Sequence, residues 1–181
     1  NTSNVKDIGW MFNGCDSLKE IDLSNFNTSN VREMDHLFAW CSSLKKLDLS
    51  AFKTENVTTM DSMFMKCTSL KELNISGFNT RNVTTMAKMF YECTSLERLI
   101  INNNSFDTGN VTNFACMFYK CNKLSNLDVS NFNTEKATDF SLMFSQCQTL
   151  KSLNLSNFNN EMYSTFAKSM GESIKSFGDL Y

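Results

Sequence analysis

The sequence has no proline, a single histidine and no basic tract, and its longest apolar runs are only a few residues long. Its 17 basic and 19 acidic residues nearly cancel, so nothing in the chain resembles the concentrated positive charge of a nucleic-acid-binding surface. A membrane-spanning helix needs roughly 20 consecutive apolar residues. We therefore expect no nucleic-acid partner and no membrane insertion by this segment.

The sequence patterns that are typical of catalytic and metal sites are also missing. His36 is the only histidine, no glycine-rich loop is present to hold a phosphate, and no paired carboxylates stand outside the repeated pattern described below. The seven cysteines do not form the C-x-x-C pairs that are typical of zinc sites. We expect no catalysis, no cofactor and no metal.

What the sequence does contain is a repeat. With 181 residues and 41% hydrophobic content, the chain is suited to one folded domain. A Met-Phe or Leu-Phe pair recurs every 26 residues, apart from one interval of 28, and a cysteine follows three residues behind each pair. The six pairs begin at Met11, Leu37, Met63, Met89, Met117 and Met143. Because the chain starts at Asn1, inside the pattern and without an initiator methionine, we expect it to be a fragment of a longer chain.

Each copy contains a short segment that predicts a β-strand. After the cysteine comes the pattern L-x-x-L-x-L, as at Leu44, Leu47 and Leu49, and the last two leucines alternate with polar residues. Alternation with a period of two is typical of a strand with one buried face. Parallel strands are predicted near residues 20–23, 46–49, 72–75, 98–101, 126–129 and 152–155.

The second half of each copy predicts a helix. Its apolar residues recur at steps of three and four, which is the spacing of one helix face. Asn56 or the preceding Thr54 is suited to cap the start of this helix. In the third copy the apolar face consists of Val57, Met60, Met63, Phe64 and Cys67.

The two patterns together predict an α/β solenoid, with a parallel strand face and a helix on the opposite face of each repeat. One strand and one helix cannot bury their apolar faces alone, whereas stacked copies bury them against each other. The array is expected over residues 1–160, with a two-residue insertion near 102–105. Residues 161–181 lose the pattern and are expected to form a degenerate C-terminal helical cap.

The repeat resembles a known family. The pattern "CxSLxxLDLSxFNTxNVTxMxxMF" is similar to the BspA-like leucine-rich repeat, and especially to its 26-residue version in surface proteins of mycoplasmas and Gram-positive anaerobes. The resemblance covers about residues 4 to 160. It implies a leucine-rich-repeat array, an extracellular or cell-surface location, and a role in adhesion.

The cysteines that follow the Met-Phe pairs are expected to be free and buried, as small apolar side chains of the core. Disulfides and metal ligation are the alternatives, and the regular single spacing favours neither. Cys116 lies outside this column, at a position that varies among copies. We expect it to be nearer the surface, either as a tolerated substitution or as a reactive thiol.

The fourth copy is the candidate binding site. Ile100 replaces the Asp or Asn found at its position in the other copies, and the two-residue insertion enlarges the following loop. The partner would be a protein or glycan ligand on a host or neighbouring cell. Two alternatives remain open, namely neutral variation in a tolerant loop and an array that is only a structural spacer presenting another domain. The candidate residues are Arg98, Ile100, Asn102, Asn103, Asn104 and Ser105.

Overall fold

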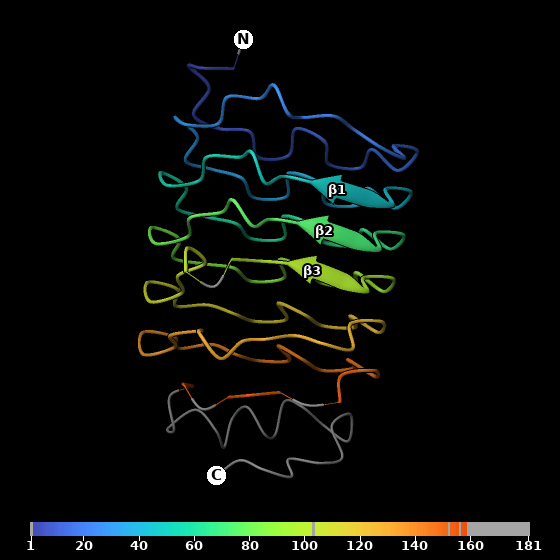
Figure 1. The fold of residues 1–181 in the computed structure, drawn as a ribbon, viewed down its shortest axis with the longest axis vertical. Coiled ribbons are helices and arrows are strands. Elements are labelled where there is room, and N and C mark those ends of the chain that lie inside the picture. Colours follow the sequence, from blue (N-terminus) through green and yellow to red (C-terminus); the bar gives the residue numbers. More distant parts are fainter. Residues whose placement is uncertain (1, 103, 152, 156, 159–181) are drawn as a thin grey trace.

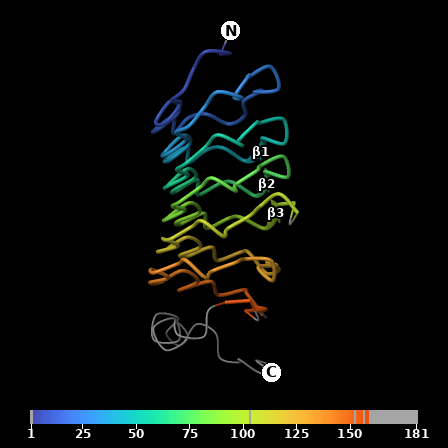
Figure 2. The same ribbon diagram turned by 90° about the vertical axis from the view of Figure 1, so that its left-hand side faces the viewer.

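The repeats form coils that stack on one another. The computed structural model describes residues 2–102, 104–151, 153–155 and 157–158. Each copy makes one coil, and successive coils lie directly over one another along the long axis of the molecule (Figure 1). The view turned by 90° shows the same stacking from the side (Figure 2). A one-dimensional array of this kind buries its apolar side chains between neighbouring coils.

One face of the stack carries a three-stranded parallel sheet in the order β1-β2-β3. The strands are β1 (Lys46–Asp48), β2 (Glu72–Asn74) and β3 (Arg98–Ile100). The predicted inward leucines align, because Leu47 pairs with Leu73 and Leu73 with Leu99. These three strands are therefore confirmed.

The other three predicted strands are not confirmed by the structure. Residues 20–23, 126–129 and 153–155 form no strand, and residue 152 lies outside the described residues. Residues 126–129 belong to the copy that follows the two-residue insertion. The sheet thus ends at β3 within the described residues.

The predicted helix is wrong, because the described part of the chain contains no helix. In the third copy, the backbone N–H groups of alternate residues donate across to the next coil instead of along the segment. Phe64 donates to the carbonyl of Met89 at 2.9 Å, and Lys66 donates to that of Tyr91 at 2.7 Å. The intervening N–H of Met65 turns back to Ser62, three residues earlier, at 3.0 Å. The segment is a pair of consecutive tight turns, and the α/β solenoid is not the fold.

Left-handed backbone conformations explain these turns. Ser62 has φ 55° and Lys66 has φ 60°, and the equivalent residues of the other copies also have positive φ, including Gly14 at 71°. A right-handed helix cannot contain such residues. Two three-residue turns in succession still place apolar side chains inward at steps of three and four. The spacing therefore matched an amphipathic helix although the backbone is not helical.

The turn segments are held in register by a second line of parallel contacts. One residue of each copy makes a β-bridge to its equivalent in the next, and Thr85 pairs with Asn113 across the insertion. The stack is thus continuous on this face even where the sheet stops. The bridged residues are Asp7, Glu33, Thr59, Thr85, Asn113 and Asp139.

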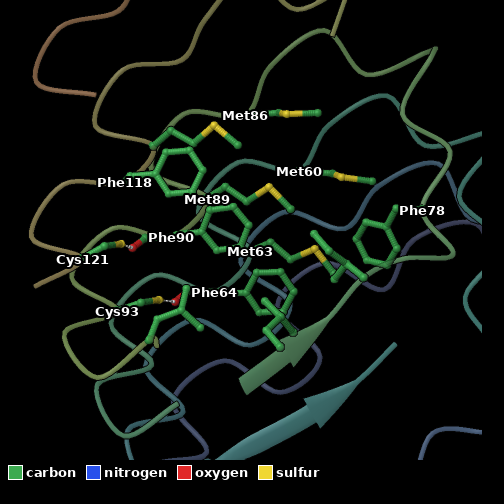
Figure 3. Close-up of a cluster of buried hydrophobic side chains, with 14 of the residues drawn as sticks. Met60, Met63, Phe64, Phe78, Met86, Met89, Phe90, Cys93, Phe118 and Cys121 are labelled. Atoms are coloured by element: carbon green, nitrogen blue, oxygen red, sulfur yellow. Dashed lines mark hydrogen bonds between the residues drawn. The ribbon is translucent and has the colours of Figure 1, made fainter. Parts of the chain in front are cut away.

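Aromatic rings run through the core in a continuous ladder. Phe64 stacks on Phe90 with 5.7 Å between ring centroids and 5° between planes, and Phe90 stacks on Phe118 at 5.1 Å. Figure 3 shows these three rings with the side chains of Met60, Met63, Met86 and Met89. The ladder comprises Phe12, Phe38, Phe64, Phe90, Phe118 and Phe144.

The cysteines form a second ladder beside the rings. The thiol of Cys93 donates to the carbonyl oxygen of Phe64 in the preceding coil at 3.0 Å, and Cys121 donates to Phe90 at 3.2 Å (Figure 3). All seven cysteines are free. Burial is confirmed except at Cys15, which is exposed in the first copy, and Cys116 is intermediate as expected. We call the five buried residues the cysteine ladder: Cys41, Cys67, Cys93, Cys121 and Cys147.

The predicted helix caps have a different role. Thr54 is buried, and its hydroxyl donates to the carbonyl of Asn79 at 2.9 Å while accepting from the Asn79 N–H at 2.7 Å. Asn56 donates its side-chain amide to the carbonyl of Ser29 in the preceding coil at 2.8 Å. Both side chains bond neighbouring coils to each other, so the capping interpretation is wrong.

The insertion in the fourth copy is absorbed in one turn. In the third copy the Phe78 N–H donates to Ile75 three residues earlier, whereas the Phe106 N–H donates to Asn102 four residues earlier, at 2.9 Å. Phe106 nevertheless stays buried in the core. The division of the chain at residue 160 stays a prediction, because the expected cap over residues 161–181 lies outside the described residues.

Candidate functional site

The outward face of the sheet carries a row of ion pairs. Glu72 on β2 lies 3.0 Å from the Lys46 ammonium on β1 and 3.5 Å from the Arg98 guanidinium on β3. The hydrogen bond from Lys46, with the nearby charges of Lys46 and Arg98, lowers the pKa of the Glu72 carboxyl. The Arg98 side chain is still 67% exposed, so most of its donors remain available to a partner.

Ile100 stands at the position where the other copies have an outward-facing Asp or Asn, and we call this set of equivalent positions the polar column. In the other copies the polar column has a structural role. Asp48, Asn74 and Ile100 are in register across the three strands. The side-chain oxygen of Asp48 accepts the N–H of Ser50 at 2.9 Å, and that of Asn74 accepts the N–H of Ser76 at 3.1 Å. This local turn is a standard use of Asp and Asn side chains, and it explains why Asp or Asn recurs in the column.

Ile100 cannot make that hydrogen bond, and the inserted loop makes it two residues later. The side-chain oxygen of Asn102 accepts the N–H of Asn104 at 3.1 Å. The insertion therefore moves the turn anchor from position 100 to position 102. As a result, position 100 is released from its structural role and carries a half-buried apolar side chain on the outward face.

A shallow groove lies beside β3. We call it the β3 groove: it has a volume of about 270 Å³ and is lined by residues 98–101 of β3 and its exit and by residues 126–128 of the next copy. It exists where the predicted fifth strand fails to pair. Leu99, Ile101 and Leu127 are only partly buried, so the groove has apolar side chains between the charged Arg98 and Asp128.

The β3 groove contains some of the predicted site residues and not others. Arg98 and Ile100 both line it. Asn102, Asn104 and Ser105 are not among its lining residues, and their polar groups are partly used within the loop, where Ser105 donates to the Asn102 carbonyl at 3.4 Å. Asn103 lies outside the described residues.

A second groove was missed by the sequence interpretation. We call it the Trp40 groove: it has a volume of about 580 Å³ and spans the first three copies. Trp40 is 46% exposed, and the Lys66 ammonium lies 3.9 Å from the centroid of its ring. The signal in the sequence was the column immediately before the cysteines, where only the second copy has an aromatic residue. The lining residues are Asn13, Gly14, Asp16, Trp40, Ser42, Lys66 and Thr68.

The buried cysteines and His36 are not among the lining residues of either groove. Burial raises the pKa of the Cys41 thiol to about 11 and that of Cys147 to about 12, so these thiols stay protonated at neutral pH. His36 is stacked on Trp10, with 3.9 Å between ring centroids. Among the described residues, no cluster of His, Cys, Asp or Glu is arranged to hold a metal ion, and no helix is long and apolar enough to cross a membrane.

Comparison with known proteins places the repeat in a family. The family model described as "Mycoplasma protein of unknown function, DUF285" matches residues 1–103 and again residues 67–179. The two overlapping matches together extend over almost the whole sequence, as expected for a repeat. No curated protein matches the chain.

Proposed function

The chain belongs to the DUF285 family of mycoplasma proteins, and from that premise we propose that it is a non-catalytic binding module of a cell-surface adhesion protein. The more specific part of the proposal is a BspA-like leucine-rich-repeat protein whose array is exposed outside the cell. The L-x-x-L-x-L segments that form β1, β2 and β3 support this assignment. The partner is a protein on a host or neighbouring cell.

One observation carries the proposal: the β3 groove lies at the coil where the outward polar column is interrupted. A regular array presents the same polar residues at every level, and such a surface gives a partner no preferred position. Ile100 and the insertion break that regularity together, and they do so without disturbing the core, since Phe106 remains buried. Insertion and polar-to-apolar replacement thus create a local surface on a preserved scaffold.

The chemistry of the groove favours a protein partner. The lining includes the apolar side chains of Leu99, Ile100 and Ile101, and Arg98 offers a guanidinium that binds carboxylates bidentately. Arginine beside apolar side chains is typical of protein–protein contacts. The β3 groove has no aromatic residue for a sugar ring to stack on. We expect the partner to insert one apolar and one acidic side chain.

A structural spacer is the second candidate. It is favoured by the phenylalanine ladder, which continues across the fourth copy with 5.1 Å between Phe90 and Phe118. A stack that is uninterrupted in this way is suited to hold another domain at a fixed distance from the cell surface.

The test uses a matched pair of substitutions in one column. Ile100→Asp replaces the apolar side chain with the residue common in other copies, and Asn74→Asp makes the corresponding change on β2. Partners would first be captured from host extracellular-matrix and serum proteins and then measured by surface plasmon resonance. We expect Ile100→Asp to weaken binding at least about tenfold, whereas Asn74→Asp should have little effect and neither should change the melting temperature. If both variants bind a confirmed partner as the wild type does, the β3 groove is not the site and the spacer is favoured.

A further inference from the structure

The Trp40 groove is separate from the β3 groove and shares no residue with it. Its volume of about 580 Å³ is within the usual range of small-ligand sites, about 300 to 1,000 Å³. Three coils contribute to it: Asn13, Gly14 and Asp16 come from the first, Trp40 and Ser42 from the second, and Lys66 and Thr68 from the third. A ligand in this groove would therefore contact three successive levels of the stack.

Trp40 has one ring face covered and the other open. Gly14, Trp40 and Lys66 occupy equivalent positions in successive coils, and all three have positive φ. Lys66 covers the ring from the third coil, with its ammonium 3.9 Å from the ring centroid. On the opposite side the equivalent residue is Gly14, and apart from residue 14 and its two chain neighbours no atom lies within 4 Å of the position that its Cβ would occupy. No side chain of residue 14 therefore covers the ring face directed toward the first coil, and Trp40 is 46% exposed.

The other tryptophan of the turn segments and Tyr91 are stacked on another ring, whereas Trp40 is in contact with a cation. Trp10 is stacked on His36 at 3.9 Å, and Tyr91 is stacked on Tyr119 at 4.9 Å. One face of each of those rings lies against another aromatic side chain. Trp40 is held on one side by a cation–π contact, which fixes its orientation, and is available to a ligand on the other.

The polar groups around the open face are mixed in character. Asp16 supplies a carboxylate acceptor, Lys66 an ammonium donor, and Asn13 an amide that both donates and accepts. Ser42 and Thr68 make only long hydrogen bonds of 3.4 Å to backbone carbonyls, so their hydroxyls are available for stronger ones. The Lys66 ammonium also lies 3.8 Å from a Glu92 carboxylate oxygen, so it is not an unpaired cation that would select for an anionic ligand.

We propose that the Trp40 groove binds a neutral oligosaccharide. The apolar C–H face of a sugar ring lies flat on an exposed indole, and its hydroxyls both donate and accept hydrogen bonds, which matches this set of side chains. An anionic ligand would meet the carboxylate of Asp16, and a peptide would need pockets for alternate side chains. The groove has one flat aromatic surface with polar groups around it.

The probes are maltotriose, chitotriose and lactose, with sialyllactose as the charged comparison. The chain has two tryptophans, so the Trp10→Phe variant leaves Trp40 as the sole indole, and its fluorescence reports on the groove. Affinity would be measured by isothermal titration calorimetry on the wild type, and the location of binding by the fluorescence of the Trp10→Phe variant.

Gly14→Asn is the decisive substitution. Asparagine tolerates positive φ better than other residues with a side chain, and its side chain would cover the open face of Trp40 without disturbing the core. Gln146→Asn is the matched control, because residue 146 is the equivalent position in the sixth copy and also has positive φ. Trp40→Leu removes the stacking surface itself.

We expect at least one neutral oligosaccharide to bind, with an affinity that Gly14→Asn and Trp40→Leu each reduce about tenfold or more and that Gln146→Asn leaves unchanged. The proposal is overturned if none of the three neutral probes binds at millimolar concentration, if only sialyllactose binds, or if Gly14→Asn binds as well as the wild type. These outcomes do not affect the β3 groove, whose test uses different residues and a protein partner.

Discussion

The buried threonine of each copy should contribute more to stability than its size suggests, and Thr54→Val tests this. Valine keeps the shape of the side chain but removes the hydroxyl. The hydroxyl makes two hydrogen bonds to the backbone of Asn79 in the next coil, at 2.7 and 2.9 Å, and Thr54 is 1% exposed. Its removal leaves one N–H and one carbonyl without their partner at the contact between two coils.

The expected loss follows from the two bonds. A typical buried hydrogen bond contributes about 1 kcal/mol net, and a buried polar group left without a partner costs about 1 to 3 kcal/mol. We expect Thr54→Val to lower the free energy of unfolding by about 2 to 3 kcal/mol. Thr54→Ser keeps the hydroxyl and should recover most of this loss, which separates the hydrogen bonds from the packing of the methyl group.

The control is Thr58→Val, in the same coil. The Thr58 hydroxyl is exposed and makes one hydrogen bond of 3.2 Å, to the Arg32 carbonyl, which also accepts the Thr58 N–H at 2.9 Å. Its loss should cost no more than about 0.5 kcal/mol. Urea unfolding followed by circular dichroism measures both variants. If Thr54→Val is no more destabilising than Thr58→Val, the threonine bonds between coils do not have the role assigned to them.

Three further predictions concern the thiols and the left-handed residues. Thiol titration of the native protein should detect Cys15 readily and Cys116 more slowly, because burial raises the pKa of Cys116. The cysteine ladder should react only after denaturation, and reaction of the ladder in the folded protein would contradict its buried position. Because burial raises the pKa of Cys41 from 9.0 to about 11, the unfolded thiol ionises first as the pH rises, and the free energy of unfolding should fall between pH 9 and 11. Lys88 is exposed with φ 57°, so Lys88→Gly should stabilise the protein by about 0.5 to 1 kcal/mol in urea unfolding, whereas Lys88→Ala should give no gain.

The sequence predicted the burial pattern better than the backbone conformation. Met60, Met63 and Phe64 are buried as their spacing indicated, and Leu47 and Leu73 align as predicted. The helix failed because apolar residues at steps of three and four are equally produced by consecutive three-residue turns. A period of hydrophobicity shows which side chains face the core, and it does not show whether N–H groups bond within the segment or to the next coil.

The candidate site was predicted in part for a related reason. The outward position of Ile100 follows from strand alternation, and the register with Asn74 confirms it. The groove beside Ile100 depends on a strand that does not form, which local patterns do not indicate. The open face of Trp40 depends on the absence of a side chain at Gly14, one coil away. That relation becomes visible only when the copies are aligned by column and the stacking direction is known.

The hydrogen bonds between coils also determine how the molecule would respond to force. Bonds such as that from Phe64 to Met89 join neighbouring coils and lie along the stack. A pull between the two ends of the stack therefore acts on one contact between coils at a time, and the outermost coil peels away before the next is loaded. Each 26-residue coil that detaches would add roughly 90 Å of extended chain. An adhesion protein built in this way would lengthen stepwise under shear and keep its remaining coils, with their binding surfaces, folded.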